Sequence, residues 1–84
     1  MKEYYFTFRS VTRAMEAEKR LKNAGMHPYL LRTPAELRKK GCGYSLRLRE
    51  SEWEPARAVL TEDGFERLFR KDGQRWEEVM GHVF

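Results

Sequence analysis

The sequence has a single cysteine, Cys42, and no long run of apolar residues. One cysteine cannot form a disulfide within the chain, so we expect a reduced thiol and a cytoplasmic location. The N-terminal stretch MKEYYFTFRS is too polar for a signal peptide or a membrane span. The sequence therefore predicts a cytoplasmic protein without a membrane partner.

Residue patterns typical of metal, cofactor and catalytic sites are also missing. The two histidines, His27 and His82, stand far from each other and from the cysteine, so no metal site is expected. The chain has neither a phosphate-binding glycine loop nor a dinucleotide fingerprint, and no nearby carboxylate pair of the kind that glycoside hydrolysis needs. These absences predict a protein that is not an enzyme and needs no cofactor.

The chain does have a modest excess of basic residues. Its 84 residues suit one small domain, residues 1–84, with a thin core. Seventeen Lys and Arg against 13 Asp and Glu give a net charge of +4. This charge favours encounters with anions but falls short of a nucleic-acid-binding arm.

Hydrophobic periodicity in the first half predicts a strand, a helix and a second strand. In EYYFTFR, the side chains of Tyr4, Phe6 and Phe8 share one face, which is the period of a half-buried strand. A helical period begins at Ser10, a good N-cap residue, and ends at Gly25, where a left-handed C-cap is expected. The segment HPYLLRT then predicts a second strand.

The second half begins with another strand and another helix. Tyr44, Leu46 and Leu48 alternate with polar residues and predict a third strand. In SEWEPARAVLTEDG, Ser51 and Glu54 have the spacing of a capping box at the start of a second helix.

The C-terminal segment FERLFRKDGQRWEEVM predicts a β-hairpin. Asp-Gly between two apolar segments is a strong turn signal, so we expect a two-residue loop at Asp72–Gly73. That loop would place Phe69 opposite Trp76 and Arg67 opposite Glu78, and both are favourable cross-strand pairs.

The predicted order of elements is βαββαβ with an extra C-terminal strand. It indicates an α+β, ferredoxin-like two-layer sandwich, in which two helices cover one face of an antiparallel sheet. Because crossover connections are right-handed, the loop from Arg32 to Gly43 should lie over the N-terminus of the first helix, near Val11. Ser10 and Thr12 are therefore candidate binding residues beside the cysteine.

Two interpretations of the cysteine, in RKKGCGYSLRL, stay open on the residues alone. The basic run that ends at Lys40 and the dipole of the first helix would lower the pKa of the Cys42 thiol. Gly41 and Gly43 would leave the sulfur accessible. Alternatively, Cys42 is a small apolar residue that continues the buried face of the strand starting at Tyr44.

Several short motifs resemble those of a known family. They are AMEAEKRLKNAG in the first helix, the turn TPAEL, and Cys-Gly before the third strand. They resemble the selenium/sulfur carrier protein-like family of small bacterial domains, in which the cysteine is the proposed attachment point. The resemblance implies that Cys42 passes sulfur or selenium from a donor protein to an acceptor protein. The matching residues are Ala17, Glu18, Lys19, Leu21, Ala24, Gly25, Pro34, Glu36, Leu37, Cys42 and Gly43.

RNA binding is another interpretation of the third strand. Lys-Gly-Cys-Gly-Tyr, ending at Tyr44, resembles the start of the RNP1 signature in RNA-recognition motifs, which have the same order of elements. If Tyr44 faced outward as in that motif, Arg47 would enter the core at a cost on the order of several kcal/mol. The sequence therefore argues against nucleic acid as a partner.

A last alternative is a protein-interaction or regulatory module in which Cys42 is structural. Independently of this alternative, the strand at residues 74–80 would leave a free sheet edge, which could pair with a second copy in a homodimer. In the interaction module, the docking surface would be the exposed face of the sheet. The residues predicted on that face are Tyr5, Thr7, Arg9, Ser45, Arg47 and Arg49.

Overall fold

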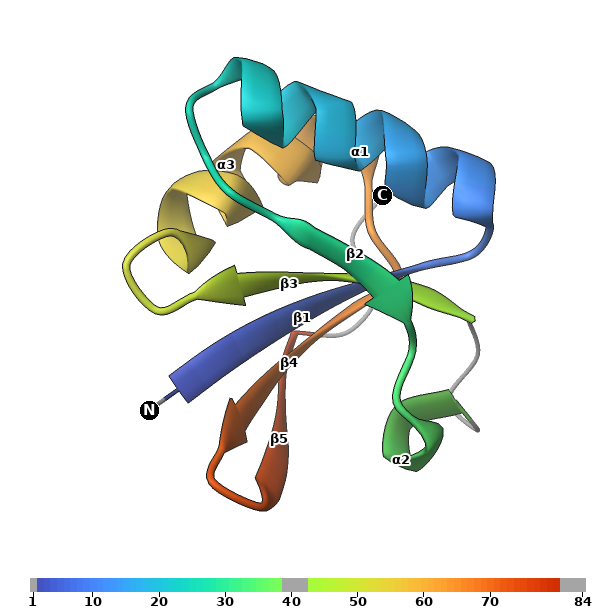
Figure 1. Ribbon diagram of the computed structural model, residues 1–84, viewed down its shortest axis with the longest axis vertical. Helices are drawn as coiled ribbons and strands as arrows, with labels where there is room; N and C mark the ends of the chain where they lie inside the picture. The colour runs from blue at the N-terminus through green and yellow to red at the C-terminus, as the bar shows by residue number, and fades with distance from the viewer. Residues whose placement is uncertain (1, 39–42, 81–84) are drawn as a thin grey trace.

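Five strands in the described part of the chain form one antiparallel sheet, and three helices accompany it (Figure 1). The structure is a computed structural model, and it describes residues 2–38 and 43–80. The fold is α+β, as the sequence predicts. In chain order the elements are β1 (Lys2–Phe8), α1 (Val11–Asn23), β2 (Tyr29–Arg32), α2 (Ala35–Arg38), β3 (Tyr44–Arg49), α3 (Trp53–Asp63), β4 (Arg67–Asp72) and β5 (Arg75–Met80).

The strand order is β2-β3-β1-β4-β5, and every neighbouring pair is antiparallel. β1 lies in the middle, so that Phe6 pairs with Leu46 on one side and with Leu68 on the other. A central strand that is covered on both faces needs apolar residues on both faces. This explains why every residue from Tyr4 to Phe8 is buried.

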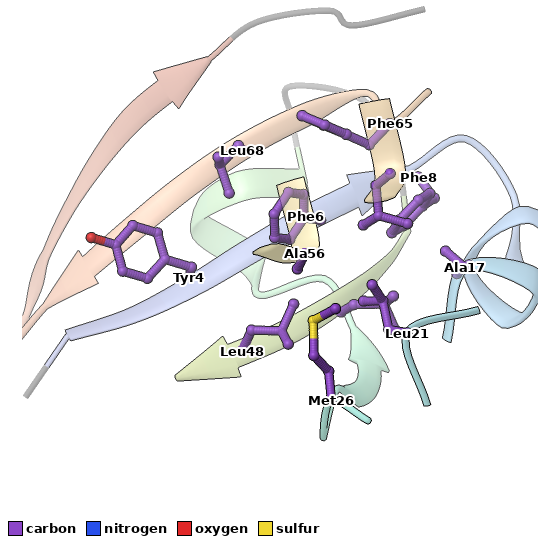
Figure 2. Close-up of a cluster of buried hydrophobic side chains, with 13 residues drawn as sticks. Tyr4, Phe6, Phe8, Ala17, Leu21, Met26, Leu48, Ala56, Phe65 and Leu68 are labelled. Atoms are coloured by element: carbon purple, nitrogen blue, oxygen red, sulfur yellow. The ribbon is translucent and has the colours of Figure 1, made fainter. Parts of the chain in front are cut away.

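α1 and α3 cover the same face of the sheet, as predicted (Figure 1). Phe6 is completely buried there and meets Phe65 edge to face, with 4.9 Å between the ring centroids. Tyr4 stacks on Trp53 of α3 at 4.5 Å. Figure 2 shows side chains from the sheet and from both helices meeting in this cluster, which we call the main core. Its members are Tyr4, Phe6, Phe8, Ala14, Ala17, Leu21, Met26, Leu46, Leu48, Ala56, Leu60, Phe65 and Leu68.

A second, smaller cluster lies on the opposite face of the sheet. Tyr5, Leu37 and Phe69 are buried in it, and Leu31 and Trp76 pack against them. The short helix α2, which the sequence patterns did not predict, supplies Leu37. Burial of the phenol, with a nearby carboxylate adding to the effect, raises the pKa of Tyr5 above its usual value.

The second cluster corrects the expectation that this face of the sheet is an open docking surface. Half of the six residues predicted on that surface are buried, and one of them, Tyr5, packs with side chains of α2 and of the β4–β5 hairpin. The buried residues are Tyr5 and Thr7, each 3% exposed, and Ser45, which is not exposed at all.

The first helix begins and ends where its capping residues predict. The Ser10 side chain accepts a hydrogen bond from the backbone N–H of Arg13 at 3.2 Å. Gly25 follows the C-cap with φ of +86°, a left-handed conformation that glycine adopts without strain.

The predicted capping box of the second long helix is wrong. α3 begins at Trp53, its N-cap is Glu52, and Glu52 makes no side-chain capping bond. The Glu52 carboxylate instead accepts the backbone N–H of His27 at 3.1 Å and lies 2.9 Å from the His27 Nδ1. The carboxylate therefore ties the segment before β2 to the start of α3.

This contact makes stability depend on pH. Burial alone would raise the pKa of the Glu52 carboxyl, but the hydrogen bonds from His27 outweigh it and lower the pKa. A lowered pKa in the folded state stabilises the fold above the ordinary carboxyl pKa of about 4.3, and the effect is lost as the pH falls through the folded-state pKa. Glu52→Gln should therefore lower the free energy of unfolding at pH 7, and the difference from the parent should shrink in acid. Urea unfolding across this pH range measures it.

The exposed Glu50 in the same turn provides the control for this prediction. Glu50→Gln should change the pH dependence less than Glu52→Gln. Equal pH profiles for the two variants would contradict the role of the His27 contact.

The β4–β5 hairpin forms as predicted, but its turn lies one residue later. The loop residues are Gly73 and Gln74, flanked by the pair Asp72 and Arg75. Gly73 has φ of +65°, and no other residue has positive φ in this turn. Glycine thus occupies the first loop position, as in a type II′ turn, rather than the second position of a type I′ turn.

This shift changes the cross-strand pairs. Phe69 lies opposite Glu78, and Lys71 lies opposite Trp76, in place of the predicted pairing of Phe69 with Trp76. Arg67 and Glu78 nevertheless form an ion pair, with 2.6 Å between Nη1 and Oε2, as diagonal neighbours.

Candidate functional site

The predicted site centres on a loop between β2 and β3 that is described only in part. Lys40, Gly41 and Cys42 lie outside the described residues. The structure describes the segments on either side, Thr33–Arg38 and Gly43–Ser45. We call these two segments together the cysteine-loop frame.

Hydrogen bonds close the base of the frame. The backbone N–H of Thr33 donates to the carbonyl oxygen of Gly43 at 2.8 Å. The hydroxyls of Thr33 and Ser45 are 2.7 Å apart, and both residues are buried. The end of β2 and the start of β3 are thereby held together, so the loop that contains the cysteine starts and ends at one fixed place.

The short helix α2 anchors the first half of the frame. Pro34 has a fixed φ and no N–H, which suits the end of β2 and the start of a helix. The backbone N–H of Leu37 donates to the Pro34 carbonyl at 2.9 Å. The Leu37 side chain is only 4% exposed and packs against Tyr5 and Phe69. Burial of this one leucine holds α2 against the sheet.

The frame does not lie where the crossover argument places it. α2 packs on the face opposite α1 (Figure 1), because Leu37 is buried there with Tyr5 and Phe69. The prediction that the loop covers the N-terminus of the first helix is therefore wrong for the described part of the loop.

The other predicted binding residues lie at the start of α1: Ser10 is its N-cap and Thr12 is in its first turn. They line a hollow of about 560 Å³ together with Arg13 and Gly64, and no residue of the cysteine-loop frame lines it. The Ser10 side chain caps the helix. The described residues thus do not bring Ser10 and Thr12 together with Gly43.

Two basic side chains lie on the N-terminal side of the cysteine. Arg32 ends β2 and Arg38 ends α2, and both are exposed. The Arg32 guanidinium carbon lies 5.8 Å from the centroid of the Tyr44 ring. Arg38 belongs to the cysteine-loop frame and Arg32 directly precedes it, so both place positive charge at the N-terminal half of the frame.

The direction of Tyr44 bears on the RNA interpretation. Tyr44 packs against the main core, and Leu46 and Leu48 are buried in it, as their alternation predicts. Arg47 is half-buried on the other face. Tyr44 therefore faces the helices, whereas the stacking aromatics of an RNA-recognition motif face away from them.

The hydroxyl pair provides a test of the frame. Thr33→Val removes the hydroxyl that meets Ser45 and leaves a buried polar group without this partner, which should lower the free energy of unfolding by about 1–3 kcal/mol. The double variant Thr33→Val/Ser45→Ala removes both hydroxyls and should regain part of that loss. Urea unfolding measures both. A single variant as stable as the parent would contradict the buried pair.

Two other features are absent from residues 2–38 and 43–80. No three His, Cys, Asp or Glu side chains come together as metal ligands among them. None of the helices in this part of the chain is both long and apolar enough to cross a membrane.

Sequence reasoning missed the residues that build the frame. A hydroxyl pair such as Thr33 and Ser45 joins two strands whose pairing is not known in advance, so no local motif reveals it. Pro34 and Leu37 did carry a signal, since both belong to the motif on which the family resemblance rests.

The fold and the frame define a class of protein: a small α+β domain with one cysteine in the loop between β2 and β3. The family model described as "Putative Se/S carrier protein-like" matches residues 3–69, and the chain belongs to this family. No curated protein and no solved structure matches the chain.

Proposed function

We propose that this protein carries a sulfur or selenium atom on Cys42, as a persulfide or a selenyl sulfide, and that it is not itself an enzyme. The observation that carries the proposal is the family match, which spans Cys42 and both halves of the cysteine-loop frame. The closed base of the frame and the exposed Arg32 and Arg38 support it. The sheet order β2-β3-β1-β4-β5, with α1 and α3 on one face, supports a ferredoxin-like classification that β5 extends.

The chemistry is an exchange in which oxidation states balance. The Cys42 thiolate attacks the terminal sulfur of a donor persulfide and forms a new S–S bond. The S–S bond of the donor breaks, and the donor leaves as a thiolate. An acceptor nucleophile then attacks the terminal sulfur on Cys42, and Cys42 leaves as a thiolate. Selenium follows the same route as a selenyl sulfide.

The carrier role assigns simple tasks to the neighbouring residues. Lys40, together with Arg38, lowers the pKa of the thiol through its positive charge. Gly41 and Gly43 have no side chains that would hinder the approach of the donor and the acceptor. The partners are therefore a donor protein and an acceptor protein, each of which presents a sulfur or selenium nucleophile or leaving group.

The proposal predicts a reactive thiolate near neutral pH. The rate of alkylation of Cys42 by iodoacetamide in the native protein should rise with a midpoint clearly below about 8.5, the pKa of an ordinary thiol. Arg38→Ala should move this midpoint upward. Arg75→Ala removes an exposed arginine on β5 and should leave the midpoint unchanged. Alkylation that occurs only after unfolding would instead make Cys42 a structural residue and end the proposal.

A further inference from the structure

A second hollow lies at the end of the sheet away from the cysteine-loop frame. It has a volume of about 570 Å³. It is formed by the start of β1, the segment from His27 to Tyr29, the end of β3 and the turn after β3. Of the β3 residues that line the hollow, Arg47 is nearest to Gly43, and the four positions between them correspond to roughly 13 Å. No residue of the cysteine-loop frame lines the hollow. The hollow is therefore distinct from the site of the proposed carrier chemistry.

An exposed aromatic ring stands in this hollow. Tyr29 is 57% exposed, although it is a large side chain on a strand. The guanidinium carbon of Arg47 lies 4.6 Å from the centroid of its ring. Arg47 also lies 3.9 Å from the Glu3 carboxylate, measured from Nε to Oε2. These contacts fix the ring on one side and leave much of its surface open to a planar ligand.

Positive groups lie close to that ring on the same face of the sheet. Tyr29 pairs with Arg47 across β2 and β3, and Arg49 pairs with Glu3 across β3 and β1. Arg47 and Arg49 are two residues apart on one strand, so they share a face at a spacing of roughly 7 Å. Lys2 also lines the hollow, from the position before Glu3 at the start of β1, where strand alternation directs it toward the other face of the sheet.

The charges in the hollow favour an anion. Lys2, Arg47 and Arg49 supply three positive charges, and Glu3 and Glu50 supply two negative ones. Arg47 is engaged by Tyr29 and Glu3, which leaves Lys2 and Arg49 as the candidate contacts for an anionic group. The volume is in the range of small-molecule sites.

We propose that this hollow binds a ribonucleoside monophosphate. The base stacks on Tyr29, the phosphate lies against Arg49 and Lys2, and the Glu3 carboxylate accepts hydrogen bonds from ribose hydroxyls. Stacking on an aromatic ring with phosphate contacts to cations is the general physics of nucleotide recognition. The chain needs no glycine-rich phosphate loop for this, because three strands supply the contacts.

The test is a titration of the full chain with AMP, followed by the backbone amide signals in NMR spectra. Saturable shifts should concentrate at residues of the hollow, and adenosine alone or inorganic phosphate alone should bind more weakly than AMP. Tyr29→Ala should weaken AMP binding roughly fivefold or more, whereas Tyr29→Phe keeps the ring and should bind nearly as well. Arg49→Ala should also weaken binding, and Arg75→Ala on β5 should not.

Three results would overturn the proposal: AMP leaves the signals of the hollow unchanged, phosphate alone binds as well as AMP, or Tyr29→Ala binds AMP like the parent. The proposal does not rest on the carrier function, since Cys42→Ser should bind AMP as the parent does.

Discussion

Phe6→Ala should lower the free energy of unfolding by about 3–5 kcal/mol, the largest loss of stability that we expect from a single substitution in the main core. Phe6 is fully buried, pairs with β3 and β4, and meets Phe65 edge to face. A domain of this size has a total stability of only about 5–10 kcal/mol, so the variant should be partly unfolded at 37 °C. Urea unfolding followed by tryptophan fluorescence measures the loss.

Two further variants keep this prediction testable if Phe6→Ala does not fold. Phe6→Leu retains most of the apolar volume and should cost clearly less than alanine. Val79→Ala removes an exposed side chain from β5 and should change stability by no more than about 0.5 kcal/mol. Similar losses for Phe6→Leu and Val79→Ala would contradict a core centred on Phe6.

Cys42→Ser should abolish loading with sulfur or selenium, which is the largest functional effect that we expect. Serine has nearly the same size but cannot form a persulfide, so the fold should persist while the attachment point is lost. Incubation with a low-molecular-weight persulfide, followed by intact mass measurement, should add one sulfur atom to the parent and none to the variant. Lys40→Ala keeps the thiol and should load more slowly, because the thiolate fraction falls.

Loading of Cys42→Ser to the same extent as the parent would contradict the assignment of Cys42. Circular dichroism of both proteins shows whether the fold is intact. With the fold intact, a loss of loading reports on the thiol rather than on stability.

Local patterns predicted most of the secondary structure because they depend on nearby residues alone. The alternation of Tyr4, Phe6 and Phe8 indicated β1, and the cap at Ser10 and the glycine at Gly25 bounded α1. Each of these patterns involves only residues on one face of a strand or within one turn of a helix. They therefore hold before any tertiary contact is known.

The errors occurred where a distant residue competes with a local pattern. Ser51 and Glu54 had capping-box spacing, but Glu52 became the N-cap and its carboxylate bonds His27 from another part of the chain. The Asp-Gly pattern at Gly73 correctly predicted a hairpin, but it did not determine which of the two loop positions the glycine occupies. Local spacing alone therefore determines neither the N-cap residue of α3 nor the loop position of the glycine.

The position of the candidate site was the least predictable feature. The crossover rule placed both ends of the loop at the correct end of the sheet but did not determine the face. The packing of Leu37 against Tyr5 and Phe69 determines the face of the sheet on which α2 lies. Tyr5, an aromatic residue on the opposite parity to Tyr4, Phe6 and Phe8, was a usable signal that both faces of β1 are covered.

The most direct test of the carrier function is the intact mass of the native protein purified without reductant. We expect a fraction of the molecules to exceed the sequence mass by one sulfur or one selenium atom, with the addition mapped to Cys42 and removed by dithiothreitol. A sample that has only the unmodified mass, and that also takes up no chalcogen from a persulfide donor, would contradict the carrier function.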